Sequence, residues 1–124
     1  MKTQTSKLFK TLMLLTAVLF MFAVQAEANA FTHNHNETEA EFKVLGKCGM
    51  CTTRIEKAAK GVKGVTYASY DLEKQMLKVK FKSDKTNQEA IEKAITNVGH
   101  DTENFKTDDK TYNNLHHCCK YKRD

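Results

Sequence analysis

Residues 41–61 read EFKVLGKCGMCTTRIEKAAKG, and this stretch decides the fold that we predict. Its first part, Glu41 to Leu45, alternates between polar and apolar side chains, which is typical of a β-strand. The loop Cys48-Gly49-Met50-Cys51 follows at once, and Thr53 and Glu56 then form a capping box, so we expect a helix to begin near Thr53. The stretch therefore predicts a strand and a helix with two cysteines in the turn between them.

A similar unit follows along the chain. Residues 65–72 and 77–82 alternate as strands do, and Thr86 with Glu89 forms a second capping box. The tetrad Ile55-Glu56-Lys57-Ala58 recurs as Ile91-Glu92-Lys93-Ala94, Gly99 is expected to stop the second helix, and residues 101–105 form a short last strand. The order predicts an α+β fold, a ferredoxin-like β-α-β-β-α-β sandwich with both helices on one face, followed by a short Cys/His-rich C-terminal helix or tail.

The N-terminal 30 residues are typical of a secretory signal peptide. Lys2, Lys7 and Lys10 precede an apolar run of about thirteen residues, and Ala28-Asn29-Ala30 is a small-residue cleavage pattern. A membrane anchor would need roughly 20 apolar residues. We therefore predict a signal peptide over residues 1–30, cleaved after Ala26 or Ala30, and a protein that is exported to the periplasm.

The rest of the chain divides into three parts. Residues 31–40 are polar, carry His33 and His35, and are predicted to be a flexible arm. Residues 41–106 form the domain, and residues 107–124 form the tail, in which we expect Asp109 to cap a short helix that runs through Cys119. A tail of this length must either dock on the domain or stay mobile.

The charges and the cysteines exclude some classes of protein. The 20 Lys and Arg residues are interspersed with 15 Asp and Glu residues, and no basic run carries interleaved aromatics, so nucleic acid is not an expected partner. The four cysteines form two close pairs, Cys48 with Cys51 and Cys118 with Cys119. A disulfide framework is the ordinary interpretation in an oxidising compartment, but this clustering favours metal ligation or redox exchange.

The Cys48–Cys51 loop has the chemistry of a soft-metal site. A helix N-terminus stabilises thiolates, which are the form of cysteine that binds metal, and Lys47 adds positive charge. Two soft sulfurs suit Cu(I) first and Hg(II) next, whereas Zn(II) usually takes four ligands. We predict Cys48 and Cys51 as the metal ligands, with no catalytic residue.

The segment from Cys48 to Ala58 resembles the heavy-metal-associated domain, a family of copper chaperones, copper-ATPase metal-binding domains and periplasmic mercury-binding proteins. The similarity extends over about 65 residues, roughly 41–105, through Val62-Lys63-Gly64-Val65 to Gly99-His100-Asp101. It implies that two loop cysteines hold the ion and pass it by ligand exchange to a metal-transporting membrane protein or another metal-binding domain. Gly46 departs from the usual methionine, and His100 from the frequent tyrosine.

Residues outside that loop are candidate additional ligands. His100 is expected beside the metal loop as a third ligand or a proton-sensitive gate, with a surface histidine as the alternative. The run His116-His117-Cys118-Cys119 places His116 and Cys119 on one face of a helix. These tail residues form a second site or fold over Cys48 and Cys51; alternatively, a tail cysteine forms a structural disulfide.

Two other functions remain open at this stage. A thiol-disulfide oxidoreductase also uses C-x-x-C at the start of a helix. Against it, the chain has no proline, whereas thioredoxin-like folds place a cis-proline beside the disulfide. A disulfide-stabilised interaction module without metal is the third class. The sequence identifies neither the physiological metal, nor the donor and acceptor, nor the oligomeric state.

Overall fold

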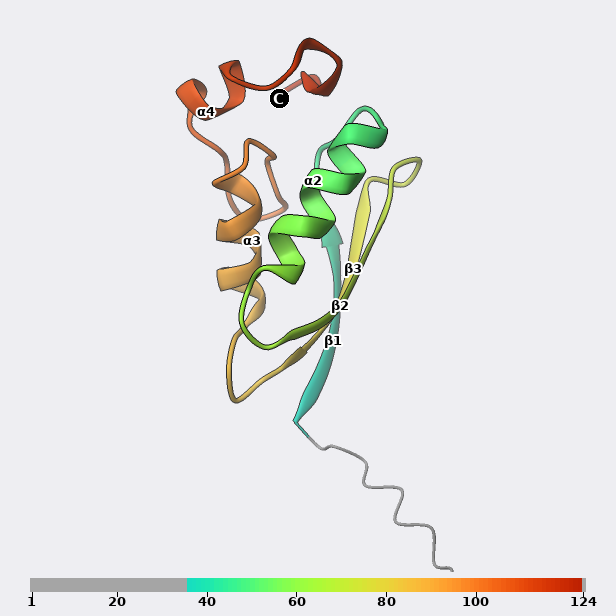
Figure 1. Ribbon diagram of the computed structural model, residues 1–124, viewed down its shortest axis with the longest axis vertical. Coiled ribbons are helices and arrows are strands. Elements are labelled where there is room, and N and C mark those ends of the chain that lie inside the picture. The colour runs from blue at the N-terminus through green and yellow to red at the C-terminus, as the bar shows by residue number, and fades with distance from the viewer. Residues whose placement is uncertain (1–35, 124) are drawn as a thin grey trace, which may run out of the picture. The chain divides into compact units, whose positions relative to one another are not determined.

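The computed structural model describes residues 36–123, and we refer to these as the described residues. Their elements are, in chain order, β1 (Glu37–Lys43), α2 (Gly49–Lys60), β2 (Val65–Asp71), β3 (Met76–Lys82), α3 (Gln88–Thr96), α4 (Asp109–Asn113) and the short 3-10 helix η1 (His117–Cys119) (Figure 1). Within this range no helix has the length and apolar character that crossing a membrane requires.

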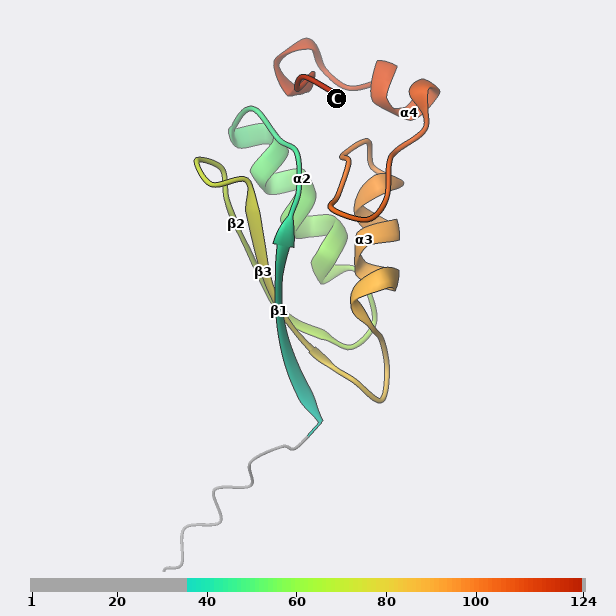
Figure 2. The same ribbon diagram turned by 180° about the vertical axis from the view of Figure 1, so that it is seen from behind.

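The three strands form an antiparallel sheet in the order β1-β3-β2. Helices α2 and α3 cover one face of this sheet, as two opposite views show (Figures 1 and 2). The apolar side chains of the central strand, at Leu77, Val79 and Phe81, are buried, as are Ile55 and Ile91 on the helices. This is the α+β sandwich that the alternating and helical patterns predict.

The first strand is longer than predicted. Because β1 begins at Glu37, the boundary of the polar arm at residue 40 is wrong, and residues 37–40 pair with β3 as far as Lys82. His33, His35 and the predicted signal peptide lie outside the described residues.

The last predicted strand is wrong in extent. Of residues 101–105, only Thr102 forms a β-bridge, with Val44. The reason lies in α3, where the buried carboxylate of Glu92 accepts hydrogen bonds from the Thr102 hydroxyl at 2.7 Å and the Asn104 backbone N–H at 3.1 Å. These bonds turn the chain away from β1 after a single pair.

Both helix starts differ from the predicted capping boxes. Helix α2 begins at Gly49, a turn before Thr53, whose hydroxyl donates to the Gly49 carbonyl at 3.3 Å instead of capping. Helix α3 begins at Gln88 because the Asn87 side chain, not Thr86, accepts from the Ala90 N–H at 2.9 Å. The early start of α2 places the cysteine loop on the first turn of the helix.

The tail forms two short helical pieces, so the predicted single helix from Asp109 through Cys119 is wrong. Asp108, rather than Asp109, caps α4 by accepting from the Thr111 N–H at 2.9 Å. The chain then turns and enters η1, where the His116 side chain accepts from the backbone N–H of Cys118.

Hydrogen bonds and ion pairs dock the tail on the domain. The buried hydroxyl of Tyr121 accepts from the Asp101 N–H at 2.8 Å and donates to the Gly99 carbonyl at 3.0 Å. Arg123 pairs with the carboxylate of Asp101 in the domain at 3.0 Å, and also with that of Asp109 within the tail at 2.7 Å. The last residues of the chain are therefore fixed to the loop that follows α3.

Gly99 is the point at which the tail enters the core. Its φ of +101° lies in the left-handed region, which favours glycine, and a Cβ there would lie 2.7 Å from Leu115 Cδ2. The predicted stop of the second helix thus also makes room for a buried leucine of the tail.

Candidate metal centre

Cys48 and Cys51 lie on the first turn of α2. Cys48 is the N-cap residue, in extended backbone conformation, and is partly buried, whereas Cys51 is fully buried. Their Sγ atoms are 3.5 Å apart. The local chain geometry alone therefore directs both sulfurs of the C-x-x-C loop to one point.

The docked tail brings the second cysteine pair to the same point. Cys118 Sγ lies 3.3 Å and Cys119 Sγ 3.5 Å from Cys48 Sγ, and the two tail sulfurs are 3.9 Å apart. All four cysteines are free thiols in this structure. Of the two arrangements predicted for the tail, the structure has the one in which it folds over Cys48 and Cys51.

Two further soft or borderline groups border the sulfur cluster. Met50 Sδ is 3.6 Å from Cys118 Sγ, and its side chain is 49% exposed. His116 Nδ1 lies 3.3 Å from the same sulfur, while His117 is exposed and its ring lies tilted against the His116 ring. Met50, which lies between the two loop cysteines in the sequence, is thus a thioether beside the cluster.

The cluster favours an anion on Cys48. Burial raises the pKa of this thiol, but the backbone N–H of Cys51 and the thiols of Cys118, Cys119 and Cys51 together lower the pKa to about 6. The Cys48 side chain makes no full N-cap hydrogen bond, so the Cys51 N–H acts on it at longer range. Cys48 is therefore mainly a thiolate at neutral pH.

The tail cysteines behave in the opposite way. The contact of Cys118 with Cys48, and then its partial burial, raise the pKa of the Cys118 thiol. Burial first, and then the neighbouring Cys51 and Cys48, raise the pKa of Cys119. Without an ion, the cluster thus holds one thiolate, on Cys48, which the neighbouring thiols stabilise.

His100 is fully buried, so the alternative of a surface histidine is wrong. Its Nδ1 lies 2.8 Å from the Leu45 carbonyl oxygen and its ring stacks on Tyr121 at 5.7 Å. Burial, together with the charge of Arg54, lowers the pKa of His100, so the ring is neutral and donates through Nδ1. Nε2 has no hydrogen-bond partner among the described residues. His100 is not in the sulfur cluster, and its role as a ligand stays a prediction.

The structure gives a physical reason for glycine, rather than the family's usual methionine, at residue 46, and this reason lies beneath the cysteine loop. The Tyr70 hydroxyl donates to the Val44 carbonyl at 2.7 Å and fills the space under the cysteines. A Cβ on Gly46 would lie 2.8 Å from that hydroxyl and 3.2 Å from Cys51 Cβ. The tyrosine therefore occupies the volume that a longer side chain at residue 46 would need.

The donor set suits soft ions. Within the part of the chain that the structure describes, Cys48, Cys118 and Cys119 form the one group of at least three Cys, His, Asp or Glu ligand atoms that lie within 4.8 Å of one another. Thiolate sulfur favours Cu(I), Hg(II) and Zn(II) over Mg(II) and Ca(II), which take oxygen ligands. The sequence did not indicate the residues that hold the tail in place, namely Tyr121, Asp101 and Arg123, because their pairing depends on the folded chain.

Comparison with known proteins agrees with this chemistry. Residues 46–101 match the model of the heavy-metal-associated domain. The COP-associated protein of Helicobacter felis is 41% identical over 54 residues, which are 44% of this chain and 80% of that protein. A copper-exporting P-type ATPase of Staphylococcus epidermidis is 37% identical over 67 residues, or 54% of this chain but only 8% of the ATPase.

Solved structures show the same fold. The CopZ metallochaperone is 29% identical with a TM-score of 0.51, over 52% of this chain and 98% of that one. Oxidised MerP from Ralstonia metallidurans CH34 is 25% identical with a TM-score of 0.52, over 54% of this chain and 94% of that one. The family match ends at residue 101, before the tail. With its cysteine loop, its sandwich and these relatives, the chain belongs to the heavy-metal-associated domain family.

Proposed function

We propose that this protein is a non-enzymatic carrier of Cu(I), with Hg(II) as the next candidate cargo and Zn(II) as a weaker one. The observation that carries the proposal is the position of Cys48, whose sulfur lies within 3.5 Å of three other cysteine sulfurs. The preference for Cu(I) is supported by the similarity to a copper-exporting P-type ATPase and to the copper-binding domain of another P-type ATPase, and by the softness of the donor set.

The carrier releases its cargo by ligand exchange. Cys48 and Cys51 hold the ion, and Cys118 adds a third sulfur from the partly exposed side. An acceptor thiolate replaces one protein sulfur at a time, so the ion stays bound to sulfur throughout. Because Cys119 is buried and Cys118 is not, Cys118 is the tail ligand that an acceptor displaces first.

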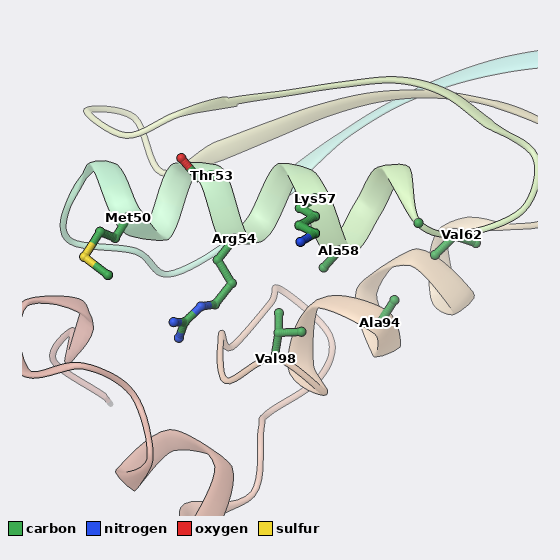
Figure 3. Close-up of a pocket in the computed structure, with 9 residues that line it drawn as sticks. Met50, Thr53, Arg54, Lys57, Ala58, Val62, Ala94 and Val98 are labelled. Atoms are coloured by element: carbon green, nitrogen blue, oxygen red, sulfur yellow. The ribbon is translucent and has the colours of Figure 1, made fainter.

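The surface beside the cluster supports docking of a metal-transporting membrane protein or another metal-binding domain. A groove of about 760 Å³ runs between α2 and α3, with Met50 near the cluster and Arg54 and Lys57 along its side. Figure 3 shows Met50 and Arg54 extending from α2 on the side of α3 and the tail. With Lys47 and Lys60, these cations favour an acceptor whose matching surface is acidic, and transfer rates should fall as salt rises.

We also propose that the protein is exported and acts in the periplasm. The support is the pattern of residues 1–30, namely a basic start, an apolar run and small residues before Ala30. Mass spectrometry of the protein from a periplasmic extract tests this. An N-terminus at Glu27 or Phe31 supports export, and an intact Met1 in the cytoplasmic fraction contradicts it.

The main test is an anaerobic Cu(I) titration of the reduced chain against a chromophoric Cu(I) chelator. We expect one tightly bound Cu(I) per chain, X-ray absorption with three sulfur neighbours, and transfer to a partner domain without release to the chelator. Cys48→Ser should weaken binding by more than about 1000-fold, or ~4 kcal/mol. Cys51→Ser should weaken it less, because the tail sulfurs remain. Insulin-reductase activity without tight Cu(I) binding would instead favour the oxidoreductase.

A further inference from the structure

The three sulfurs of Cys48, Cys118 and Cys119 form a triangle with edges of 3.3, 3.5 and 3.9 Å. Metal–sulfur bonds of about 2.3 Å would place the sulfurs about 4.6 Å apart in a linear site and about 4.0 Å apart in a planar trigonal site. All three edges are shorter than either value. An ion bonded to this triangle must therefore lie out of its plane, by about 1 Å for bonds of that length.

A fourth sulfur does not complete a tetrahedron. The group whose ligand atoms all lie within 4.8 Å of one another contains Cys48, Cys118 and Cys119 but not Cys51, which contacts Cys48 at 3.5 Å. Tetrahedral Zn(II) would need all four sulfurs at nearly equal separations. The triangle instead suits an ion that forms three bonds and carries a lone pair on its fourth side.

We propose that Cys48, Cys118 and Cys119 form a three-sulfur pyramidal site for a trivalent metalloid, arsenic(III) or antimony(III). This site goes beyond the proposed carriage of copper, because it uses both tail cysteines, Cys118 and Cys119, and does not require Cys51. The two cargoes exclude each other, since Cys48 belongs to both ligand sets.

The chemistry of binding is a condensation without a redox step. Arsenous acid, As(OH)₃, exchanges each hydroxide for one cysteine sulfur, so that an As–O bond breaks and an As–S bond forms each time. The hydroxides replaced by Cys118 and Cys119 leave as water with the thiol protons, whereas the hydroxide replaced by the Cys48 thiolate takes its proton from solvent. Three sulfurs thus release three waters, and arsenic remains in the +3 state. Two of the thiols are adjacent in the chain, which lets them chelate one ion before the third joins.

The structure provides both an entry side and a rigid base for this site. Cys119 is fully buried, whereas Cys48 and Cys118 are partly exposed, so the ion enters from their side. The exposed thioether of Met50 lies 3.6 Å from Cys118 at that entrance. Tyr121 fixes the tail through the backbone of residues 99 and 101, so the triangle is assembled before an ion arrives.

The experiment titrates the reduced full chain with sodium arsenite under anaerobic conditions. We expect one arsenic per chain, a fall in reactive thiols from four to one, and three sulfur neighbours in arsenic X-ray absorption. Cys118→Ser should weaken binding by more than about 100-fold, which exceeds the 10–100-fold cost of changing an outer neighbour. Cys51→Ser is the matched control and should change the arsenite affinity by less than about threefold.

Two results would overturn the site. They are the loss of only two reactive thiols on arsenite binding, or equal weakening by Cys51→Ser and Cys118→Ser. Circular dichroism of each variant shows that the domain is folded, and the partly exposed Cys118 is chosen because its substitution leaves the buried Cys119 in place. A parallel Cu(I) titration separates the two proposals, because Cys51→Ser should weaken Cu(I) binding while leaving arsenite binding intact.

Discussion

The two cysteine pairs of this molecule reach the same point by different routes. Cys48 and Cys51 are three residues apart, and the start of α2 alone brings their sulfurs to 3.5 Å. Cys118 lies 70 residues from Cys48, and its sulfur approaches within 3.3 Å only because the tail is docked. A site built by local geometry persists whenever its helix forms, whereas one built by docking depends on every contact that holds the tail.

Among the changes that leave the loop pair intact, the largest effect should come from removing both tail sulfurs. In the double variant Cys118→Ser/Cys119→Ser we expect the Cu(I) affinity to fall by about 100-fold, or ~2.7 kcal/mol. The loop pair still binds, so binding should not vanish, and the number of sulfur neighbours should fall from three to two. Competition titration and copper X-ray absorption measure both quantities. An unchanged affinity and coordination number would show that the tail cysteines do not ligate copper.

The next effect tests the docking of the tail without touching a sulfur. Tyr121→Phe keeps the ring but removes the hydroxyl that pairs with the backbone at Asp101 and Gly99. Two buried backbone groups then lack a partner, which should weaken docking by about 2 kcal/mol. We expect faster alkylation of Cys119 and faster amide exchange over residues 115–121.

Tyr67→Phe is a matched control for that change, because Tyr67 lies on β2 and is 45% exposed. It should leave the alkylation of Cys119 unchanged. If the two variants behave alike, the Tyr121 hydroxyl does not hold the tail.

This contrast also explains which parts of the structure could be predicted from the sequence. The loop, the helices and the sheet follow from patterns within a few residues, such as the alternation of Leu77, Val79 and Phe81 around the lysines. Cys48 and Cys51 could be selected as candidate ligands on the same basis. Folding of the tail over these two cysteines could also be proposed from the residue types alone, because His and Cys are metal ligands wherever they lie.

The errors occurred where distant groups compete with a local signal. The sequence pattern predicts a capping box of Thr53 and Glu56. In the fold, the Glu56 carboxylate instead accepts a hydrogen bond from the Tyr70 backbone N–H at 2.9 Å, and the helix begins earlier, at Gly49. Glu92 looks like a surface residue of a helix, yet it is buried and turns the chain at residue 102. Arg123 looks like part of a basic terminus, yet it is an anchor. No local pattern reveals such partners.

Beneath the loop, Gly46 offers a smaller test of the local route. Gly46→Ala would place a Cβ 2.8 Å from the Tyr70 hydroxyl, and this overpacking should lower the free energy of unfolding by about 1.5 kcal/mol. In a Tyr70→Phe background the nearest contact is absent, so the same substitution should cost less. Urea unfolding of the four proteins in this double-mutant cycle measures the difference. Equal costs in both backgrounds would mean that Tyr70 does not fill the space under the loop.

The smallest expected effect concerns the electrostatic link between the two pairs. Although burial opposes ionisation, the backbone N–H of Cys51 and the neighbouring thiols lower the pKa of Cys48 to about 6. The rate of iodoacetamide alkylation at Cys48, followed by peptide mass spectrometry, should therefore be constant above about pH 7 and fall roughly tenfold for each pH unit well below 6.

Cys118→Ala removes one thiol donor, worth about 1 kcal/mol, and should raise the pKa of Cys48 by somewhat less than one unit. Because a raised pKa reduces the thiolate fraction only near and below it, the variant should react more slowly at pH 6 and almost equally at pH 8. A profile identical to that of the unaltered chain at both pH values would show that the Cys118 thiol does not lower the pKa of Cys48, although the two sulfurs are in contact.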